Sequence, residues 1–340
     1  MKRIAIIGMG GISAVHIASL LGENLGTIEA ICDIREDRIE NAKKSIPYEV
    51  KAFSDWKKML EEIKPDVVHI CTPHYLHAEM AIEAMNSGAD VYLEKPAAMN
   101  YDEGLKILEV QKTTGKKVCV SFQNRVIPTN MGAKNIIDSG EMGKFLGARG
   151  FMTWKRCGAY YTESGWRGAW DTEGGGVLMN QSIHTLDLLQ YFGGKVTKTE
   201  GTASLRTNKG TIEVEDTAEA TLYHENGAHS VFYATNSNVI DASVFIEIYL
   251  EKGKLMLQDD KLYRNDGTGY VMICDGVNDL YPGKKVWGAG HAMMMKNFYD
   301  SLDSEEHGYY CTLEEGIQIL KVIGDIYRSG STTLVHKANP

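Results

Sequence analysis

Residues 4–13 of the chain read IAIIGMGGIS, an apolar run that leads directly into a cluster of glycines. The stretch matches the pattern G-x-G-x-x-[G/A], with Ser13 in the third, small position. In this pattern the first glycine, Gly8, permits a tight turn, and the second, Gly10, lets the backbone approach a pyrophosphate. The helix that follows offers unpaired N–H groups and the positive end of its dipole to the phosphates. The stretch therefore predicts a strand, turn and helix that bind a dinucleotide.

The second expected strand supplies the acid that such a motif requires. Asp33 ends this strand, 20 residues after Ser13, where a carboxylate binds the ribose hydroxyls of the adenosine. A carboxylate there disfavours the 2′-phosphate of NADP, so we expect NAD in preference to NADP. The nearby Arg35 reduces this preference. The residues expected to bind the cofactor in this part of the chain are Gly8, Gly10, Gly11, Ile12, Asp33, Ile34 and Arg35.

The first 122 residues alternate short apolar runs with helix-like stretches. Continuous apolar runs between helices indicate parallel strands that are buried on both faces and joined by right-handed crossovers. We therefore expect residues 1–122 to form a doubly wound, parallel dinucleotide-binding sheet. The expected strands are 4–7, 28–32, 50–53, 67–71, 91–93 and 118–122, and the expected helices are 12–21, 36–45, 54–63, 75–87 and 101–114.

Beyond residue 122 the pattern changes to stretches with partial period-2 alternation. This alternation indicates a large, mostly antiparallel open sheet with helices on one face. We expect residues 123–340 to form an α+β domain for substrate binding and oligomerisation, and the uncovered face predicts a homodimer or homotetramer. The expected strands are 145–154, 216–223, 230–235, 245–250 and 255–257, and the expected helices are 131–138, 178–192 and 312–328.

Composition excludes several classes of protein. The chain of 340 residues has 36 basic and 45 acidic side chains, a net charge of −9 that argues against binding to nucleic acid or to an anionic membrane surface. Its apolar runs are too short for a membrane span, and its N-terminus lacks the pattern of a signal peptide, so we expect a cytoplasmic protein. The six cysteines form no CxxC pair and lack zinc spacing, so we expect reduced thiols and no metal site.

Two further segments could carry chemistry. The expected strand 91–93 runs into Glu94-Lys95-Pro96, and ligands bind at the carboxyl ends of strands in an open parallel sheet, so we expect Lys95 to project into the cofactor crevice. A second glycine cluster, 174–176, precedes the expected helix 178–192, on which Asn180 and His184 would share a face. The residues alone favour a structural role for His184, in which its imidazole forms a hydrogen bond with Asp187 or with the backbone.

Taken together, these segments resemble the Gfo/Idh/MocA family of NAD(P)-dependent sugar and cyclitol oxidoreductases. The residues that carry the resemblance span about 190 residues and are Gly8-x-Gly10-x-x-Ser13, Asp33, the run CTPHYLHA at 71–78, Glu94-Lys95-Pro96, and Gly174-Gly175-Gly176 followed by His184-x-x-Asp187.

The resemblance implies a role for several individual residues. Lys95 would be the active-site lysine and His184 the catalytic histidine. Thr72, Pro73 and His77 would lie on the nicotinamide side of the cofactor, with Glu94 beside it. Asn180 departs from the pattern, because many family members carry aspartate there. Asparagine cannot act as a base, although it can orient a substrate by hydrogen bonds.

An aromatic loop and the end of the sixth strand supply the remaining candidates. Six aromatic residues lie within residues 151–170, with arginines among them, and such a mixture suits the apolar faces and hydroxyl rims of sugars. The alternative is a loop used for packing or subunit contact. At the domain junction, Gln123 is expected to contact the cofactor. The expected substrate-binding residues are Lys95, Arg125, Tyr160, Trp166, Arg167, Asn180 and His184.

The chemistry that follows is the transfer of a hydride between a secondary alcohol of a sugar, sugar derivative or cyclitol and NAD. His184 would accept the hydroxyl proton as general base, and Lys95 would stabilise the developing negative charge. Two alternatives stay open. One is an NAD-dependent enzyme that cleaves glycosides by transient oxidation and elimination, and the other is a non-catalytic regulator that senses a dinucleotide.

Overall fold

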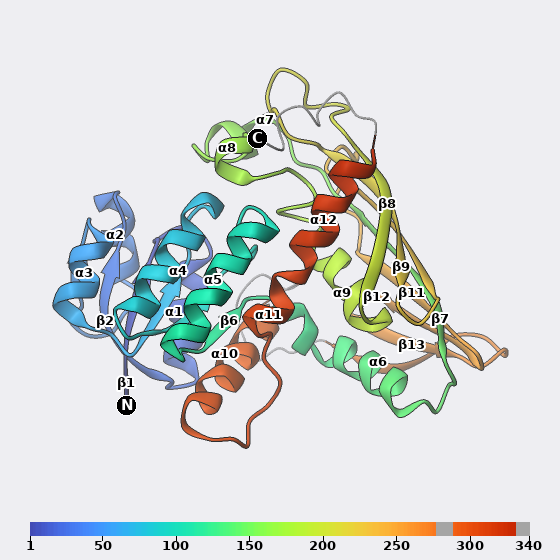
Figure 1. The fold of residues 1–340 in the computed structure, drawn as a ribbon, viewed down its shortest axis with the longest axis horizontal. Helices are drawn as coiled ribbons and strands as arrows, with labels where there is room; N and C mark the ends of the chain where they lie inside the picture. Colours follow the sequence, from blue (N-terminus) through green and yellow to red (C-terminus); the bar gives the residue numbers. More distant parts are fainter. Residues whose placement is uncertain (277–287, 331–340) are drawn as a thin grey trace. The chain divides into compact units, whose positions relative to one another are not determined.

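The first 120 residues contribute the six strands of a parallel sheet (Figure 1). These strands are β1 (Lys2–Ile7), β2 (Gly26–Cys32), β3 (Lys51–Phe53), β4 (Val67–Ile70), β5 (Asp90–Leu93) and β6 (Val118–Val120). They lie in the order β3-β2-β1-β4-β5-β6, and every neighbouring pair is parallel. The computed structural model, which describes residues 1–276 and 288–330, thus confirms the doubly wound sheet, whose strand order reverses between β1 and β4.

Helices alternate with these strands close to where the sequence predicts them. They are α1 (Ser13–Gly22), α2 (Glu36–Lys43), α3 (Trp56–Ile63), α4 (His77–Asn86) and α5 (Tyr101–Thr114), with the short 3-10 turns η1 (His74–Leu76) and η2 (Gln123–Val126). Local signals explain the agreement. The Asp55 carboxylate accepts N–H groups at the start of α3, and the Asn100 side chain accepts one at the start of α5. Gly115 then ends α5 in a left-handed conformation with φ of 67°.

Two helices from late in the chain belong to this first unit. Of the described residues, 1–123 and 288–317 form one compact unit, and 124–276 and 318–330 form the other. Helix α10 (Gly288–Asp303) packs against α1, and β6 pairs with the segment before α11 (Leu313–Gly316) through a bridge between Cys119 and Thr312. This arrangement differs from the single boundary expected at residue 122. The contacts responsible join residues almost 200 positions apart or more, so no local pattern predicts them.

The second unit contains an open sheet of eight strands. They are β7 (Phe145–Thr153), β8 (Val196–Ser204), β9 (Thr217–His224), β10 (His229–Thr235), β11 (Phe245–Leu250), β12 (Gly253–Gln258), β13 (Lys261–Asn265) and β14 (Val271–Asp275). Their order is β14-β13-β12-β11-β7-β10-β9-β8, and all neighbours are antiparallel except β7 and β10. The predicted mostly antiparallel sheet is therefore confirmed.

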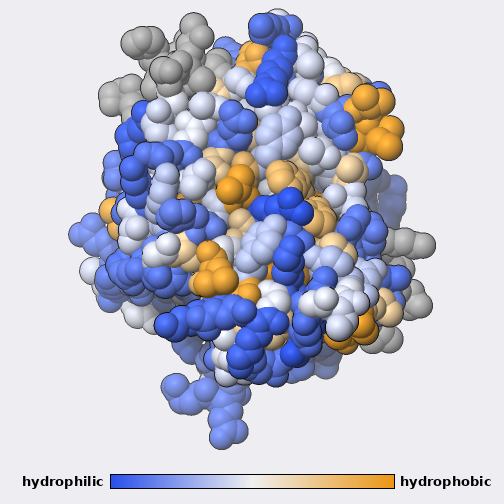
Figure 2. All heavy atoms as spheres, turned by 90° about the vertical axis from the view of Figure 1, so that its right-hand side faces the viewer, coloured by the Kyte–Doolittle hydropathy of each residue, from blue (hydrophilic) through white to orange (hydrophobic). Residues whose placement is uncertain are grey.

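Helices lie along one face of this sheet, as Figure 1 shows. The helices of the unit are α6 (Pro128–Ser139), α7 (Gly158–Thr162), α8 (Trp170–Glu173), α9 (Ile183–Gly193) and α12 (Gln318–Ser329). Contacts join α9 to β7, β9 and β10, α12 to β8, and α6 to β12, β13 and β14. Along β10 the side chains alternate between buried and exposed, with Phe232 buried and Val231 exposed. In Figure 2, the side of the molecule at the right of Figure 1 shows apolar residues in separate patches among hydrophilic ones.

Two predicted helices differ in the structure. Helix α9 begins at Ile183 instead of Leu178, because residues 177–182 form turns in which the Ser182 N–H donates to the Val177 carbonyl. Asn180 therefore precedes the helix, and the expectation that it shares a helical face with His184 is wrong. The expected helix 312–328 is divided at Ile317 into α11 and α12, which belong to different units. Strands β8, β13 and β14 and helices α7, α8 and α10 were not predicted. Among the described residues, no helix is long and apolar enough to span a membrane.

The N-terminus of α11 gives a test of the fold. The Thr312 hydroxyl accepts the Glu315 N–H, and the Glu315 carboxylate accepts the Thr312 N–H in return. Because Thr312→Ala removes one half of this capping box, we expect the free energy of unfolding to fall by about 1 kcal/mol in chemical denaturation. Thr113→Ala, at the exposed end of α5, should change it by less than about 0.5 kcal/mol. Equal effects of the two substitutions would contradict this role of the cap.

Candidate active site

The glycine loop after β1 is shaped for close approach of a ligand. Gly8 has φ of 91°, and a Cβ added there would stand 2.7 Å from the carbonyl oxygen of Cys71, at the end of β4. At Gly10 and Gly11, by contrast, a Cβ would meet nothing within 4 Å. The open space over these two glycines and the start of α1 beyond them fit a pyrophosphate.

Asp33 ties this loop to the end of β2. Its buried carboxylate accepts the Met9 N–H at 2.7 Å and the Arg35 N–H at 2.9 Å. The guanidinium of Arg35 pairs instead with Asp37, and the neighbouring Ile34 is 88% exposed. The carboxylate therefore has a fixed place beside the glycine loop, where a ribose hydroxyl could donate to it.

His77 connects the ends of β4 and β5. Its Nδ1 lies 2.7 Å from the carbonyl oxygen of Pro96, and its Nε2 lies 2.9 Å from that of Thr72. The imidazole is fully buried, and burial lowers the pKa of His77 while the two carbonyls oppose that shift. Because one ring bridges both segments, it fixes the turn that carries Lys95 relative to the segment that carries Thr72 and Pro73.

Glu94 is buried within the first unit. Its carboxylate lies 2.9 Å from Nε2 of His16 and 3.6 Å from Nε2 of His291, and it accepts the N–H of Lys95 at 3.3 Å. Burial alone would raise the pKa of Glu94, but hydrogen bonds from the two histidines outweigh burial and hold this pKa well below its usual range. Sequence reasoning expected Glu94 beside the cofactor and missed both histidines, because His16 is 78 residues away in the chain and His291 almost 200.

In the second unit, two buried carboxylates organise the second glycine cluster. The Glu215 carboxylate accepts N–H groups of Gly176 and Leu178 at 2.9–3.0 Å. A Cβ on Gly176 would stand 1.9 Å from the Glu215 carbonyl oxygen, so only glycine fits. Glu173 accepts the Gly168 N–H at 2.6 Å and the Asn180 amide at 2.7 Å. Burial raises the pKa of both carboxyl groups to about 7.

Several residues of the aromatic loop come together around Tyr160. The Arg167 guanidinium lies 4.5 Å from the centre of the Tyr160 ring and 4.8 Å from that of Trp166. The Tyr160 hydroxyl accepts the Gln181 side-chain amide at 2.7 Å, and Gln181 is next to Asn180 in the chain. The predicted residues Tyr160, Trp166 and Arg167 thus form one cluster of rings and a guanidinium, and Gln181 joins it to the chain segment that contains Asn180.

His184 and Arg125 lie in buried surroundings. His184 sits in the first turn of α9 and is 8% exposed. Arg125 donates through Nε and a terminal nitrogen to the two oxygens of Asp187, at 2.8 and 2.6 Å, and both side chains are buried. Arg125 therefore forms an ion pair with Asp187 of α9, and its contact with a substrate stays a prediction. Gln123, also buried, ends the first unit just after β6.

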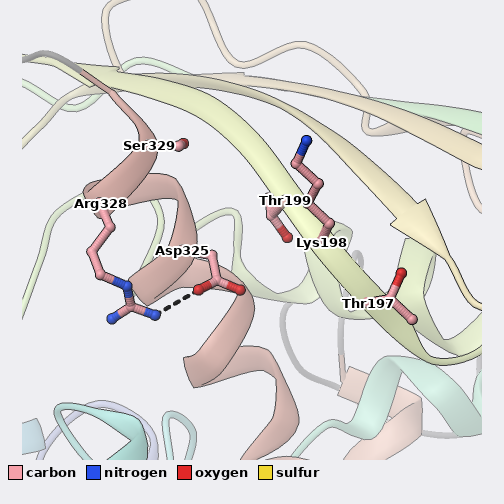
Figure 3. Close-up of a pocket in the computed structure, with 6 residues that line it drawn as sticks. All are labelled: Thr197, Lys198, Thr199, Asp325, Arg328 and Ser329. Atoms are coloured by element: carbon pink, nitrogen blue, oxygen red, sulfur yellow. Dashed lines mark hydrogen bonds and ion pairs between the residues drawn. The ribbon is translucent and has the colours of Figure 1, made fainter.

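A surface pocket elsewhere contains none of the predicted residues. It has a volume of about 350 Å³, lies between β8 and α12, and is lined by Thr197, Lys198, Thr199, Asp325, Arg328 and Ser329 (Figure 3). Asp325 and Arg328 form an ion pair with each other, and their side chains are at least partly exposed. These groups offer no arrangement for hydride or proton transfer.

Comparisons with known proteins add to this geometry. Residues 2–122 match the family model "Oxidoreductase family, NAD-binding Rossmann fold", and residues 131–256 match "GFO/IDH/MocA C-terminal domain". A scyllo-inositol 2-dehydrogenase (NAD⁺) of Bacillus subtilis is 27% identical, over 75% of this chain and 73% of that protein. A D-glucoside 3-dehydrogenase of Escherichia coli K12 is 27% identical, over 66% of this chain and 67% of that protein. The crystal structure of the WlbA dehydrogenase of Bordetella pertussis, in complex with NADH and UDP-GlcNAcA, matches with 26% identity and a TM-score of 0.83 over 96% of both chains.

The buried Glu173 predicts a dependence of stability on pH. Its pKa of about 7 in the folded state exceeds the ordinary 4.5, so the unfolded chain loses this proton first as pH rises. The folded state is therefore destabilised progressively between about pH 4.5 and 7. We expect Glu173→Gln to gain stability relative to wild type between pH 5 and pH 8, by up to about 3 kcal/mol, in denaturation at each pH.

The matched control for this series is Glu61→Gln, which changes an exposed carboxylate on α3. Its stability relative to wild type should not follow this trend. A Glu173→Gln difference that stays constant from pH 5 to pH 8 would show that Glu173 holds no raised pKa.

Proposed function

Because this chain belongs to the Gfo/Idh/MocA family of NAD-binding oxidoreductases, we propose that it oxidises one secondary alcohol of a sugar, a sugar derivative or a cyclitol. The observation that carries the proposal is the loop of Gly8–Ser13 with Asp33 beside it, which fits NAD at the switch point of the parallel sheet. The inositol and glucoside dehydrogenases among its relatives support this class of substrate.

In the mechanism that we propose, proton transfer is assigned to His184. When bound, the nicotinamide supplies the acceptor for the hydride. His184 takes the proton of the substrate hydroxyl as general base, and the Lys95 ammonium stabilises the negative charge that develops on the same oxygen. The position of Lys95 after β5, in a turn held by His77, supports this role because such a group must be fixed before the reaction.

Substrate orientation is assigned to the cluster around Tyr160. The rings of Tyr160 and Trp166 offer apolar faces to a sugar, and Arg167 and Asn180 offer hydrogen bonds to its hydroxyl groups. Asn180 cannot accept a proton as a base. Its amide nitrogen donates to Glu173, which fixes the direction of the side chain and leaves it an orienting role.

We also propose a homodimer or homotetramer formed through the uncovered face of the second sheet. Val231 on β10 is 48% exposed there, and the rings of Phe151 and Phe245 stack at 6.1 Å on neighbouring strands. Such a face gains stability when a second copy covers it. A cytoplasmic location stays a prediction.

A substrate screen tests the proposed class. NAD reduction is measured over inositols, sugars, uronic acids and glycosides, with a parallel NADP series. We expect NADH to accumulate with at least one polyol or sugar, and little turnover with NADP because Asp33 disfavours a 2′-phosphate. Release of aglycone from a glycoside without net NADH would instead establish cleavage. Binding of NAD without turnover of any compound would favour the regulator.

Lys95→Met tests the assigned role of the lysine. We expect kcat on the substrate found in the screen to fall by about 100-fold or more, because the charge that stabilises the oxyanion is lost. The Kd of NAD, measured by calorimetry, should stay within about three-fold, since the glycine loop and Asp33 are unchanged. Lys112→Met, on the exposed surface of α5, is the control and should retain full activity. A Lys95→Met enzyme with nearly full turnover would refute the assignment.

A further inference from the structure

A chain of buried hydrogen bonds in the first unit ends on Glu94. The Tyr299 hydroxyl lies 2.9 Å from Nε2 of His69, and Nδ1 of His69 lies 2.9 Å from Nδ1 of His16. Nε2 of His16 in turn lies 2.9 Å from Glu94. The four side chains come from α10, β4, α1 and the end of β5, and none is more than 6% exposed.

The positions of the protons in this chain follow from its geometry. The contact between Nδ1 of His69 and Nδ1 of His16 holds a single proton, and burial lowers the pKa of His16 and His69, which keeps both imidazoles neutral. Tyr299 then donates to His69, His69 donates to His16, and His16 donates to Glu94. The reverse direction would require a protonated Glu94. The Lys95 N–H and His291 also face this carboxylate, so the donors around it favour its ionised form.

The carboxylate lies on the nicotinamide side of the switch point. Asp33 ends β2 and binds the adenosine ribose, and the loop Gly8–Ser13 receives the pyrophosphate, so the nicotinamide half of NAD extends toward β4 and β5. Glu94 follows β5 directly, and its N–H donates to the Ile70 carbonyl at the end of β4. A fixed negative charge is therefore built into the part of the unit over which the nicotinamide lies.

We propose that Glu94, kept ionised by the N–H groups that donate to it directly, biases the cofactor site toward the oxidised dinucleotide. The oxidised nicotinamide ring carries a positive charge that the reduced ring lacks, so a buried anion stabilises NAD⁺ more than NADH. This inference shares with the proposed function only the binding of NAD. It assigns no part in the reaction to the substrate-binding residues.

Cofactor affinities measured without substrate test the inference. The Kd of NAD⁺ and of NADH is determined by calorimetry for wild type, Glu94→Gln, Glu94→Asp and Tyr299→Phe. We expect Glu94→Gln to raise the ratio Kd(NAD⁺)/Kd(NADH) about ten-fold, through weaker binding of NAD⁺, because it removes a charge in a medium of low dielectric constant. Glu94→Asp retains the charge and should keep the ratio within about two-fold of wild type.

Tyr299→Phe separates the charge from the packing. It removes the donor at the far end of the chain but leaves Glu94 in place, so thermal stability should fall while the affinity ratio stays at the wild-type value. A ratio that Glu94→Gln leaves unchanged, or an equal loss of both affinities, would overturn the inference. If Glu94→Gln does not fold, Glu94→Ala removes the charge in its place: a ratio raised about ten-fold in Glu94→Ala but not in Glu94→Asp supports the inference, and equal ratios in the two variants overturn it.

A metal analysis completes the test, because His16, Glu94 and His291 place their ligand atoms within 4.8 Å of one another. One equivalent of a transition metal in purified wild-type protein, absent from Glu94→Gln, would overturn the inference, since a bound cation would cancel the charge. Metal-free wild-type protein supports it. Because every measurement concerns cofactor or metal alone, a failed substrate screen leaves these results unaffected.

Discussion

The contact between Gly8 and the end of β4 is the constraint on which the cofactor side of the molecule depends. The backbone of Gly8 runs so close to the Cys71 carbonyl that a side chain cannot be added there. This closeness brings the ends of β1 and β4 together at the point where the strand order reverses. The start of α1, the carboxylate of Asp33 and the turn of Lys95 all lie at the carboxyl ends of the strands around that point. Packing thus requires glycine at position 8, whereas the open space at Gly10 and Gly11 fits the approach of a phosphate.

Both units contain buried carboxyl groups, whose pKa values shift in opposite directions in the two units. In the first unit, imidazole donors keep the pKa of Glu94 low. In the second, burial dominates and raises the pKa of Glu173 and Glu215 to about 7, although backbone N–H groups donate to both. At Glu94 the two imidazoles outweigh the cost of burial, whereas at Glu173 and Glu215 the donors, mostly backbone N–H groups, do not, so these two carboxyl groups hold their protons to higher pH. Each unit thus has a buried carboxylate that accepts backbone N–H groups beside a segment predicted to bind a ligand, and the pKa values of the two carboxyl groups shift in opposite directions.

The site could be predicted to the extent that it is local in sequence. The glycine motif, Asp33 and the Glu94-Lys95-Pro96 turn each lie beside a strand whose periodicity is clear, so their place at the edge of the sheet follows from the order of the elements. At Asn180, by contrast, the prediction from local sequence was wrong. The spacing to His184 suggests one continuous helix, but Glu215 draws the N–H groups of Gly176 and Leu178 into a turn, and α9 begins only at Ile183.

The amino-acid sequence by itself determined that the strands of the first sheet are parallel and doubly wound, the class of the second sheet and the nature of the cofactor. Apolar runs, caps and glycine spacing act over a few residues, and these short-range preferences are strong enough to specify elements and motifs. Only the tertiary structure decided that α10 joins the first unit, that His69, His16 and Tyr299 line up behind Glu94, and that Glu173 holds Asn180. Those contacts form when buried polar groups from distant segments must find partners, and no local pattern records which partners they find.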